Sequence, residues 1–155
     1  MKKLSLVVPV YFEEDCIAQF LKETIPVLKG LGMNWEIVFI DDGSTDRTTE
    51  IIKEFAVNAP EVKLIEFSYN QGKQAAVSAG IRYATGDYLL YMDPDLQDPP
   101  DEIPLFVSKI EQGYDLVFGI RKEKMDSGIN KIYSKIFWGT LNRFTGLKIP
   151  KGLAV

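Results

Sequence analysis

Short apolar runs alternate along the chain with longer segments whose apolar residues recur every three or four positions. The runs are rich in Val, Ile, Leu, Phe and Tyr and do not alternate cleanly with polar residues. That pattern is typical of strands covered on both faces of a sheet. It predicts five strands, at residues 4–8, 36–40, 63–67, 87–92 and 115–119.

The segments between these runs have the spacing of amphipathic helices. Ser44 or Thr45, together with Asp46, can cap the start of one of them, and Pro99-Pro100 is a plausible start signal for another. The predicted helices cover residues 14–29, 46–56, 74–84 and 101–111.

Strand–helix alternation at this spacing predicts an α/β fold with a doubly wound, mostly parallel sheet and helices on both faces. A chain of 155 residues is long enough for one domain with a substantial core. Ligands of such sheets bind outside the carboxyl ends of the strands. Polar residues that directly follow strands are therefore the candidates for a functional site.

Composition narrows the class of protein. A single cysteine, Cys16, excludes an internal disulfide framework and fits a reducing compartment. The start Met1-Lys2-Lys3 superficially resembles a signal peptide, but Pro9 interrupts the apolar run that follows, so a first strand is expected instead. No uninterrupted apolar stretch approaches the ~18 residues that span a bilayer.

The net charge of −4 hides a division along the chain. Residues 1–120 hold ten Lys/Arg and twenty Asp/Glu, for a net of −10, whereas residues 121–155 hold eight and two, for a net of +6. This predicts an acidic α/β body followed by a basic segment of the same domain, and the basic segment meets either an anionic surface or the acidic body itself. Segment 129–144 has a basic amphipathic pattern, which fits either a membrane-surface helix or a helix packed on its own sheet.

The most informative motif is Asp93-Pro94-Asp95-Leu96-Gln97, which follows the fourth apolar run. Its carboxylate and amide oxygens suit Mg²⁺ or Mn²⁺. A zinc site is disfavoured because the chain has no histidine and one cysteine. Since substrate phosphates usually complete the coordination of such a cation, the motif indicates an enzyme with a phosphorylated or nucleotide substrate.

Two adjacent acids, Asp41 and Asp42, follow the second run. Either carboxylate can accept a hydrogen bond from a ribose hydroxyl or a base N–H. Turn and capping chemistry alone explains Gly43, Ser44 and Asp46, but it does not explain two acids directly after a strand.

Two basic residues also stand at predicted carboxyl ends. Lys73 lies near the start of a helix, where it can reach a diphosphate, although no P-loop pattern is present. Arg121 follows the fifth run and can clamp phosphate oxygens. For both residues, an ordinary exposed basic side chain is the alternative. The small residues Ala75, Ala76, Ala79 and Gly80 favour close helix–sheet packing.

Together these residues resemble glycosyltransferase family 2, with its GT-A fold, over essentially the whole chain. The sequence Asp-x-Asp-Leu-Gln-Asp-Pro-Pro is most similar to that of the polyprenyl-phosphate (dolichyl-phosphate) sugar synthases. The matching strings are Val7-Val8-Pro9-Val10-Tyr11, Asp41-Asp42-Gly43-Ser44-Thr45-Asp46, Asn70-Gln71-Gly72-Lys73, Gly86-Asp87-Tyr88 and Met92 to Pro100.

The resemblance implies a role for each candidate residue. Asp93 would approach the ribose or sugar, and Arg121 would face the phosphates of the donor or acceptor. Asp95 and Gln97 would bind Mg²⁺ or Mn²⁺. The nucleoside would be surrounded by Pro9, Tyr11, Glu13, Asp41 and Asp42. The chain departs from the family in two places: Phe12 stands where Asn is usual, and the chain stops at Val155, short of further acceptor-site residues.

The implied activity is an inverting transfer of a sugar from a UDP- or GDP-sugar to a polyprenyl (lipid) phosphate at the cytoplasmic face of the membrane. No nucleic-acid partner is expected. A phosphate acceptor is already anionic and needs no strong base, which fits the absence of histidine. A saccharide hydroxyl acceptor, as in polysaccharide or lipopolysaccharide synthesis, would need a carboxylate base such as Asp98. A nucleotide-sugar-binding fragment without activity is the other alternative.

Overall fold

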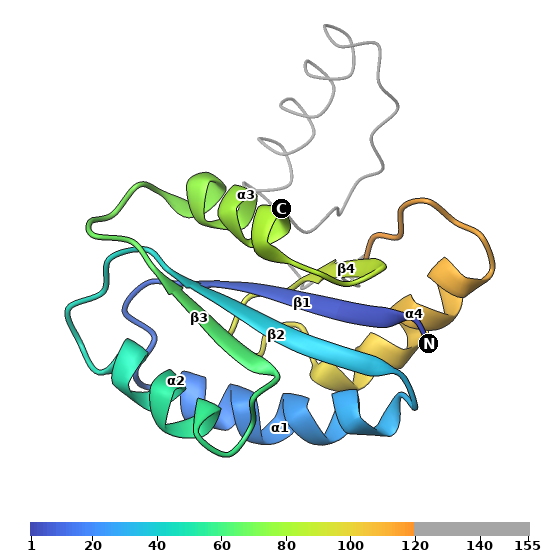
Figure 1. Ribbon diagram of the computed structural model, residues 1–155, viewed down its shortest axis with the longest axis horizontal. Helices are drawn as coiled ribbons and strands as arrows, with labels where there is room; N and C mark the ends of the chain where they lie inside the picture. Colours follow the sequence, from blue (N-terminus) through green and yellow to red (C-terminus); the bar gives the residue numbers. More distant parts are fainter. Residues whose placement is uncertain (120–155) are drawn as a thin grey trace, which may run out of the picture. The chain divides into compact units, whose positions relative to one another are not determined.

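A computed structural model describes residues 1–119 of the chain (Figure 1). Four of the five predicted strands and all four predicted helices in this part are confirmed, with shifted ends. The strands are β1 (Lys3–Val10), β2 (Asn34–Asp41), β3 (Val62–Glu66) and β4 (Tyr88–Tyr91). The helices are α1 (Ile17–Gly30), α2 (Thr48–Ala56), α3 (Lys73–Tyr83), the 3₁₀ turn η1 (Pro100–Glu102) and α4 (Ile103–Glu111).

The four strands form one parallel sheet in the order β3-β2-β1-β4. Val7 of β1 aligns with Val38 of β2 on one side and with Tyr91 of β4 on the other. The chain therefore builds outward from β1 to β3 and then returns to the opposite side of β1. The point between β1 and β4 where the direction reverses is where doubly wound sheets bind ligands.

Helices cover both faces of the sheet, with α1 and α2 on one side and α3 on the other (Figure 1). On the α1 side, Phe20 of α1 meets Phe39 of β2 edge to face, with ring centroids 6.1 Å apart, inside the larger core cluster. A smaller cluster of Val7, Val38, Ile40 and Ala76 lies on the other face. Burial on both sides explains why β1 and β2 read as nearly continuous apolar runs.

Small residues let α3 approach the sheet closely, as the sequence predicted. Ala76 is fully buried in the smaller core cluster. A methyl group added at Gly80 would overlap the side chains of Val7 and Ile40. A larger residue at Gly80 would therefore push away the helix that carries Lys73 at its first position.

The predicted strand at 115–119 is wrong, since these residues form no strand. An apolar run becomes a strand only when a neighbouring strand pairs with it, and a sequence pattern cannot show that partner. The chain divides into two compact units, Met1–Ser108 and Lys109–Val155. The basic segment 121–155 and the predicted helix 129–144 lie outside the described residues.

A buried carboxylate joins the amino ends of three strands. Glu36 of β2 is 1% exposed and pairs with Lys3 of β1 and Lys63 of β3, each at 2.6 Å. It also accepts hydrogen bonds from the Ser5 hydroxyl at 2.6 Å and the Thr85 N–H at 2.7 Å. Burial alone would raise the pKa of Glu36, but these partners outweigh it and hold the pKa well below its usual range. This network lies at the end of the sheet opposite to the carboxyl ends.

No helix within residues 1–119 is long and apolar enough to cross a membrane.

Candidate donor-binding cleft

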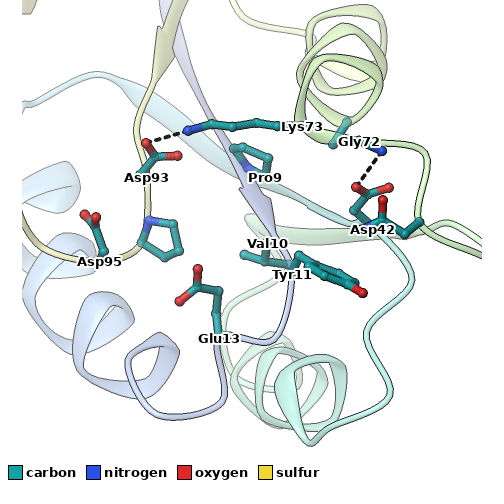
Figure 2. A pocket seen from close by; sticks show the side chains of 12 residues that line it. Pro9, Val10, Tyr11, Glu13, Asp42, Gly72, Lys73, Asp93 and Asp95 are labelled. Carbon is teal, nitrogen blue, oxygen red and sulfur yellow. Dashed lines mark hydrogen bonds and ion pairs between the residues drawn. The ribbon is translucent and has the colours of Figure 1, made fainter. Parts of the chain in front are cut away.

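A cleft of about 290 Å³ opens at the carboxyl ends of the strands, close to the lower limit of small-molecule sites. Figure 2 shows Asp93 and Asp95 on one side of it and Tyr11 and Asp42 on the other. Seven of the sequence-predicted site residues line this cleft: Pro9, Tyr11, Glu13, Asp42, Lys73, Asp93 and Asp95. Asp41 and Gln97 are not among the lining residues, and Arg121 lies outside the part of the chain that the structure describes.

The turn after β1 places the Tyr11 ring in the cleft lining, with the Phe12 ring next to it. Tyr11 and Phe12 are each about half exposed, and their ring centroids lie 4.2 Å apart. Phe12 has φ +57°, a left-handed conformation that Asn tolerates better than Phe. Its N–H donates a 3.0 Å hydrogen bond to Ser44 Oγ. Ser44 thus fixes this turn and does not cap the next helix, whereas Asp46, also predicted as a cap, accepts the Thr48 N–H at 3.1 Å.

The acids after β2 have different surroundings. Asp42 is 4% exposed, and its two oxygens accept the N–H groups of Gln71 at 2.7 Å and Gly72 at 2.9 Å. Asp41 is 2% exposed; its Oδ2 accepts the Ser44 N–H at 3.0 Å. Asp41 Oδ1 is buried and has no hydrogen-bond partner within the described residues, although Asp41 does not line the cleft.

Gly43 is required by the turn between these acids and α2. It has φ +79°, and a Cβ at this position would lie 2.7 Å from the carbonyl carbon of Tyr69. Backbone atoms cannot move aside as a flexible side chain can. The turn after β2 therefore packs directly against the loop that leads to α3.

Lys73 and Asp93 form an ion pair across the cleft. Lys73 Nζ lies 2.9 Å from Asp93 Oδ2, and the Tyr91 hydroxyl donates to Asp93 Oδ1 at 2.7 Å. Partial burial lowers the pKa of Lys73, but hydrogen bonding to Tyr91 and Asp93 and the Asp93 charge raise it above its usual value. Burial raises the pKa of Tyr91, and although the hydrogen bond with Lys73 lowers it, contact with Asp93 keeps it above its usual value. Lys73 therefore stays protonated at the cleft, and the carboxylate of Asp93 balances its charge.

Asp95 and Glu13 are the other carboxylates here. Asp95 is exposed, and its Oδ1 accepts the Gln97 N–H at 3.0 Å. Glu13 Oε2 accepts a 2.9 Å hydrogen bond from the Cys16 thiol. Burial, the bond to Glu13 and the charges of Glu13 and Asp95 raise the pKa of Cys16 to about 12. The thiol is therefore protonated near neutral pH and is not a nucleophile.

The charged side chains of the cleft favour the binding of a metal cation together with an anionic ligand. Four acids line it, namely Glu13, Asp42, Asp93 and Asp95, and Lys73 is the one basic residue among the described lining residues. Among residues 1–119, no group of three or more His, Cys, Asp or Glu side chains could hold a metal ion. A donor set of few exposed oxygens fits Mg²⁺ or Mn²⁺ whose coordination substrate phosphates complete.

Tyr91 contacts the site residues Lys73 and Asp93 but was not predicted from the sequence. Tyr91 is the last residue of β4 and stands two positions before Asp93, and in extended backbone side chains two positions apart point to the same face. That spacing was the available signal. The lining residues that were also not singled out for the site are Val10, Asn70, Gly72, Ala76 and Pro94.

Comparisons with known proteins agree with this architecture. The family model described as Glycosyl transferase family 2 matches residues 5–153. A similar protein is the undecaprenyl-phosphate 4-deoxy-4-formamido-L-arabinose transferase of Edwardsiella ictaluri, 40% identical over 144 residues. The match covers 92% of this chain and 44% of that relative. The chain thus spans less than half the length of the curated relatives it matches.

Solved structures show the same fold. Glucosyl-3-phosphoglycerate synthase from Mycobacterium tuberculosis, in complex with Mn²⁺, UDP-glucose and phosphoglyceric acid, has a TM-score of 0.68 and 20% identity, covering 96% of this chain and 53% of that one. A mannosyltransferase from Pyrobaculum calidifontis in complex with GDP-Man and Mn²⁺ has a TM-score of 0.61 and 24% identity, covering 79% and 36%.

Proposed function

The chain belongs to glycosyltransferase family 2, and on that premise we propose that it transfers a sugar from a nucleoside-diphosphate sugar to a polyprenyl phosphate. One observation carries the proposal. Tyr11, Lys73 and Asp95, far apart in sequence, line one cleft at the carboxyl ends of a parallel sheet. The curated relatives named undecaprenyl-phosphate transferases support the choice of acceptor.

The nucleoside end of the donor fits the β1–β2 side of the cleft. Asp41 Oδ1 is buried, does not line the cleft and has no partner in the described part. A base N–H or ribose hydroxyl would offset the cost of leaving it unsatisfied when the turn after β2 moves to expose it. The exposed Tyr11 ring can stack on a base. Pro9 and Glu13 lie beside it in the cleft.

The diphosphate fits the opposite side. Lys73 begins α3, where helix N–H groups and the helix dipole favour anions. Asp95, with Gln97 as a second candidate ligand, would hold Mg²⁺ or Mn²⁺. The bound ion would supply positive charge for the diphosphate in a cleft that is otherwise acidic. Arg121 is a further candidate for phosphate binding.

The reaction needs no strong base from this chain. A phosphate oxygen of the acceptor attacks the anomeric carbon from the face opposite the diphosphate. The bond from that carbon to the diphosphate oxygen breaks, and the nucleoside diphosphate leaves with the electron pair, so the anomeric configuration inverts. Lys73 stabilises the charge that develops on the leaving oxygens. Asp93 orients Lys73 and lies near the ribose or sugar.

The lipid of the acceptor would place this reaction at a membrane surface, and we propose its cytoplasmic face, where nucleotide sugars are available to a chain in a reducing compartment. Segment 129–144 is the candidate contact with that surface.

Sugar transfer to defined acceptors tests the proposal. The chain would be incubated with Mn²⁺ and labelled UDP- or GDP-sugars, together with vesicles that contain undecaprenyl phosphate, undecaprenol or a soluble oligosaccharide. We expect label in the lipid fraction only with undecaprenyl phosphate, in an acid-labile glycosyl phosphate. Asp95→Ala should lose this activity, while Asp101→Ala, an exposed acid outside the cleft lining, should keep it. Label on the oligosaccharide would contradict the proposed acceptor.

A further inference from the structure

Tyr91 lies next to the cleft without lining it, and neither the motif nor the family match gives it a role. We propose that Tyr91 is a positioning residue that holds the Asp93–Lys73 pair in the orientation that binds the donor phosphates. This inference rests on the proposed function. It is based on the two oxygens of Asp93, each of which accepts one hydrogen bond, from Lys73 and from Tyr91.

Tyr91, Asp93 and Lys73, which we call the clamp, come from three parts of the fold. The Tyr91 hydroxyl comes from the end of β4 and donates to Asp93 Oδ1 at 2.7 Å. Lys73 comes from the first position of α3 and donates to Asp93 Oδ2 at 2.9 Å. Asp93 stands between them in the loop after β4. Both oxygens of Asp93 are therefore engaged, which leaves the neighbouring Asp95 as the exposed carboxylate for a metal ion.

An ion pair at this exposure would be poorly ordered without further contacts. The Lys73 side chain is 50% exposed and that of Asp93 is 29% exposed. Pairs of this kind contribute little because two flexible side chains must be fixed against solvent. Tyr91 contacts both partners, since its hydroxyl binds Asp93 and the Lys73 ammonium lies 5.6 Å from the centre of its ring, within cation–π range.

The consequence for the donor is geometric. A lysine ammonium has three donors on a long stem, and Asp93 uses one of them. With Asp93 fixed by Tyr91, the remaining N–H groups of Lys73 face a restricted region of the cleft. Without the Tyr91 hydroxyl, Asp93 can rotate and carry Lys73 with it, so ordering the ammonium against phosphate costs more on binding.

The conservative substitution Tyr91→Phe removes the hydroxyl and keeps the ring. Tyr88→Phe is a matched control on the same strand, because the Tyr88 hydroxyl meets Lys2 at 2.6 Å and lies outside the cleft lining. Two readouts are compared in wild type and both variants. One is the calorimetric affinity for UDP and GDP with Mn²⁺, and the other is the ¹⁵N ammonium NMR signal of Lys73, assigned by its loss in Lys73→Arg.

We expect Tyr91→Phe to weaken nucleotide binding about tenfold, the scale of one hydrogen bond to a charged group. It should also broaden or remove the hydrogen-bonded Lys73 signal, while its thermal midpoint and both readouts of Tyr88→Phe stay at wild-type values. A Lys73 signal that is the same in Tyr91→Phe as in the wild type, or that is missing from the wild type, would contradict the proposal that Tyr91 orders the ion pair. Equal nucleotide affinity in wild type and Tyr91→Phe would overturn its role in donor binding.

Failure of the proposed function has a different signature. A folded wild type that binds neither nucleotide would contradict the donor site. The Lys73 signal in Tyr91→Phe would still decide whether Tyr91 orders the ion pair.

Discussion

Asp42 Oδ2 accepts a 2.9 Å hydrogen bond from the N–H of Gly72, so a carboxylate at the end of β2 holds the turn in front of α3. Its other oxygen accepts the N–H of Gln71. Gly72 has φ +92° and is the residue before α3. Asp42 thereby sets where the helix that carries Lys73 begins. The Asp41-Asp42 pair in the sequence does not reveal this positioning contact.

Asp42→Ala should lower the free energy of unfolding by about 3 kcal/mol, because two loop N–H groups lose a buried charged acceptor. Urea unfolding measures this loss, and faster hydrogen exchange at the Gln71 and Gly72 amides locates it. Asp87→Ala is the control, since Asp87 accepts one exposed N–H, that of Lys3, which water can replace. Equal losses in the two variants would contradict the anchoring role of Asp42.

Stability should depend on pH through Glu36, whose folded-state pKa is lowered from 4.5 by Lys3, Lys63 and Ser5. A lowered folded-state pKa gives stability that is complete above the unfolded pKa and is lost as pH falls toward the folded value. Glu36→Gln should therefore cost about 3 kcal/mol at pH 7, and the difference from wild type should shrink as the pH falls below about 4.5.

Urea unfolding of both proteins across this pH range measures the effect. Glu66→Gln is the control, because Glu66 forms an exposed ion pair with Lys53 and should change stability by less than about 1 kcal/mol. A Glu36→Gln difference that does not vary with pH would show that packing, rather than charge, holds this network.

Phe12→Asn should raise the free energy of unfolding by about 0.5–1 kcal/mol, because Asn adopts the left-handed conformation at lower cost than Phe. Part of the gain is offset by losing the ring contact with Tyr11. Phe12→Ala removes the same contact without favouring that conformation, so it should not stabilise the protein. Chemical denaturation of the two variants separates these effects, and a less stable Phe12→Asn would contradict the account of the turn.

Gly43→Ala should cost more stability than Gly32→Ala, although both glycines have positive φ. A Cβ at Gly32 meets open space, whereas at Gly43 it meets the backbone of Tyr69. We expect about 1 kcal/mol for Gly32→Ala from the left-handed conformation alone, and a clearly larger loss for Gly43→Ala. Similar thermal midpoints for the two variants would show that the Tyr69 loop can move aside.

Most of the fold could be predicted from the sequence because the apolar pattern indicates which segments are buried. β1 and β2 are covered on both faces, so their runs are continuous and easily recognised. The segment 115–119 has a similar pattern but pairs with no strand among residues 1–119, and pairing is a tertiary property. Helix starts were also displaced, as in α1, which begins at Ile17 rather than at Glu14.

The site was predictable where the fold alone brings residues together. Lys73 and Asp93 each stand next to a recognisable strand or helix end, so their meeting at one edge follows from topology. The hydrogen bonds of Asp42 to the Gln71–Gly72 backbone do not follow from it, since they depend on the path of two loops. That Asp41 Oδ1 has no partner within residues 1–119 likewise depends on atomic detail that a strand–turn pattern does not contain.

We propose that this cleft binds a nucleoside diphosphate through a metal ion held by Asp95. Calorimetric titration of UDP and GDP into the chain, with and without Mn²⁺, tests it most directly. We expect binding of one nucleotide that requires Mn²⁺ and is lost in Asp95→Ala, with a corresponding fall of at least ~10²-fold in transfer rate. Metal-independent binding, or wild-type affinity in a folded Asp95→Ala variant, would contradict the claim.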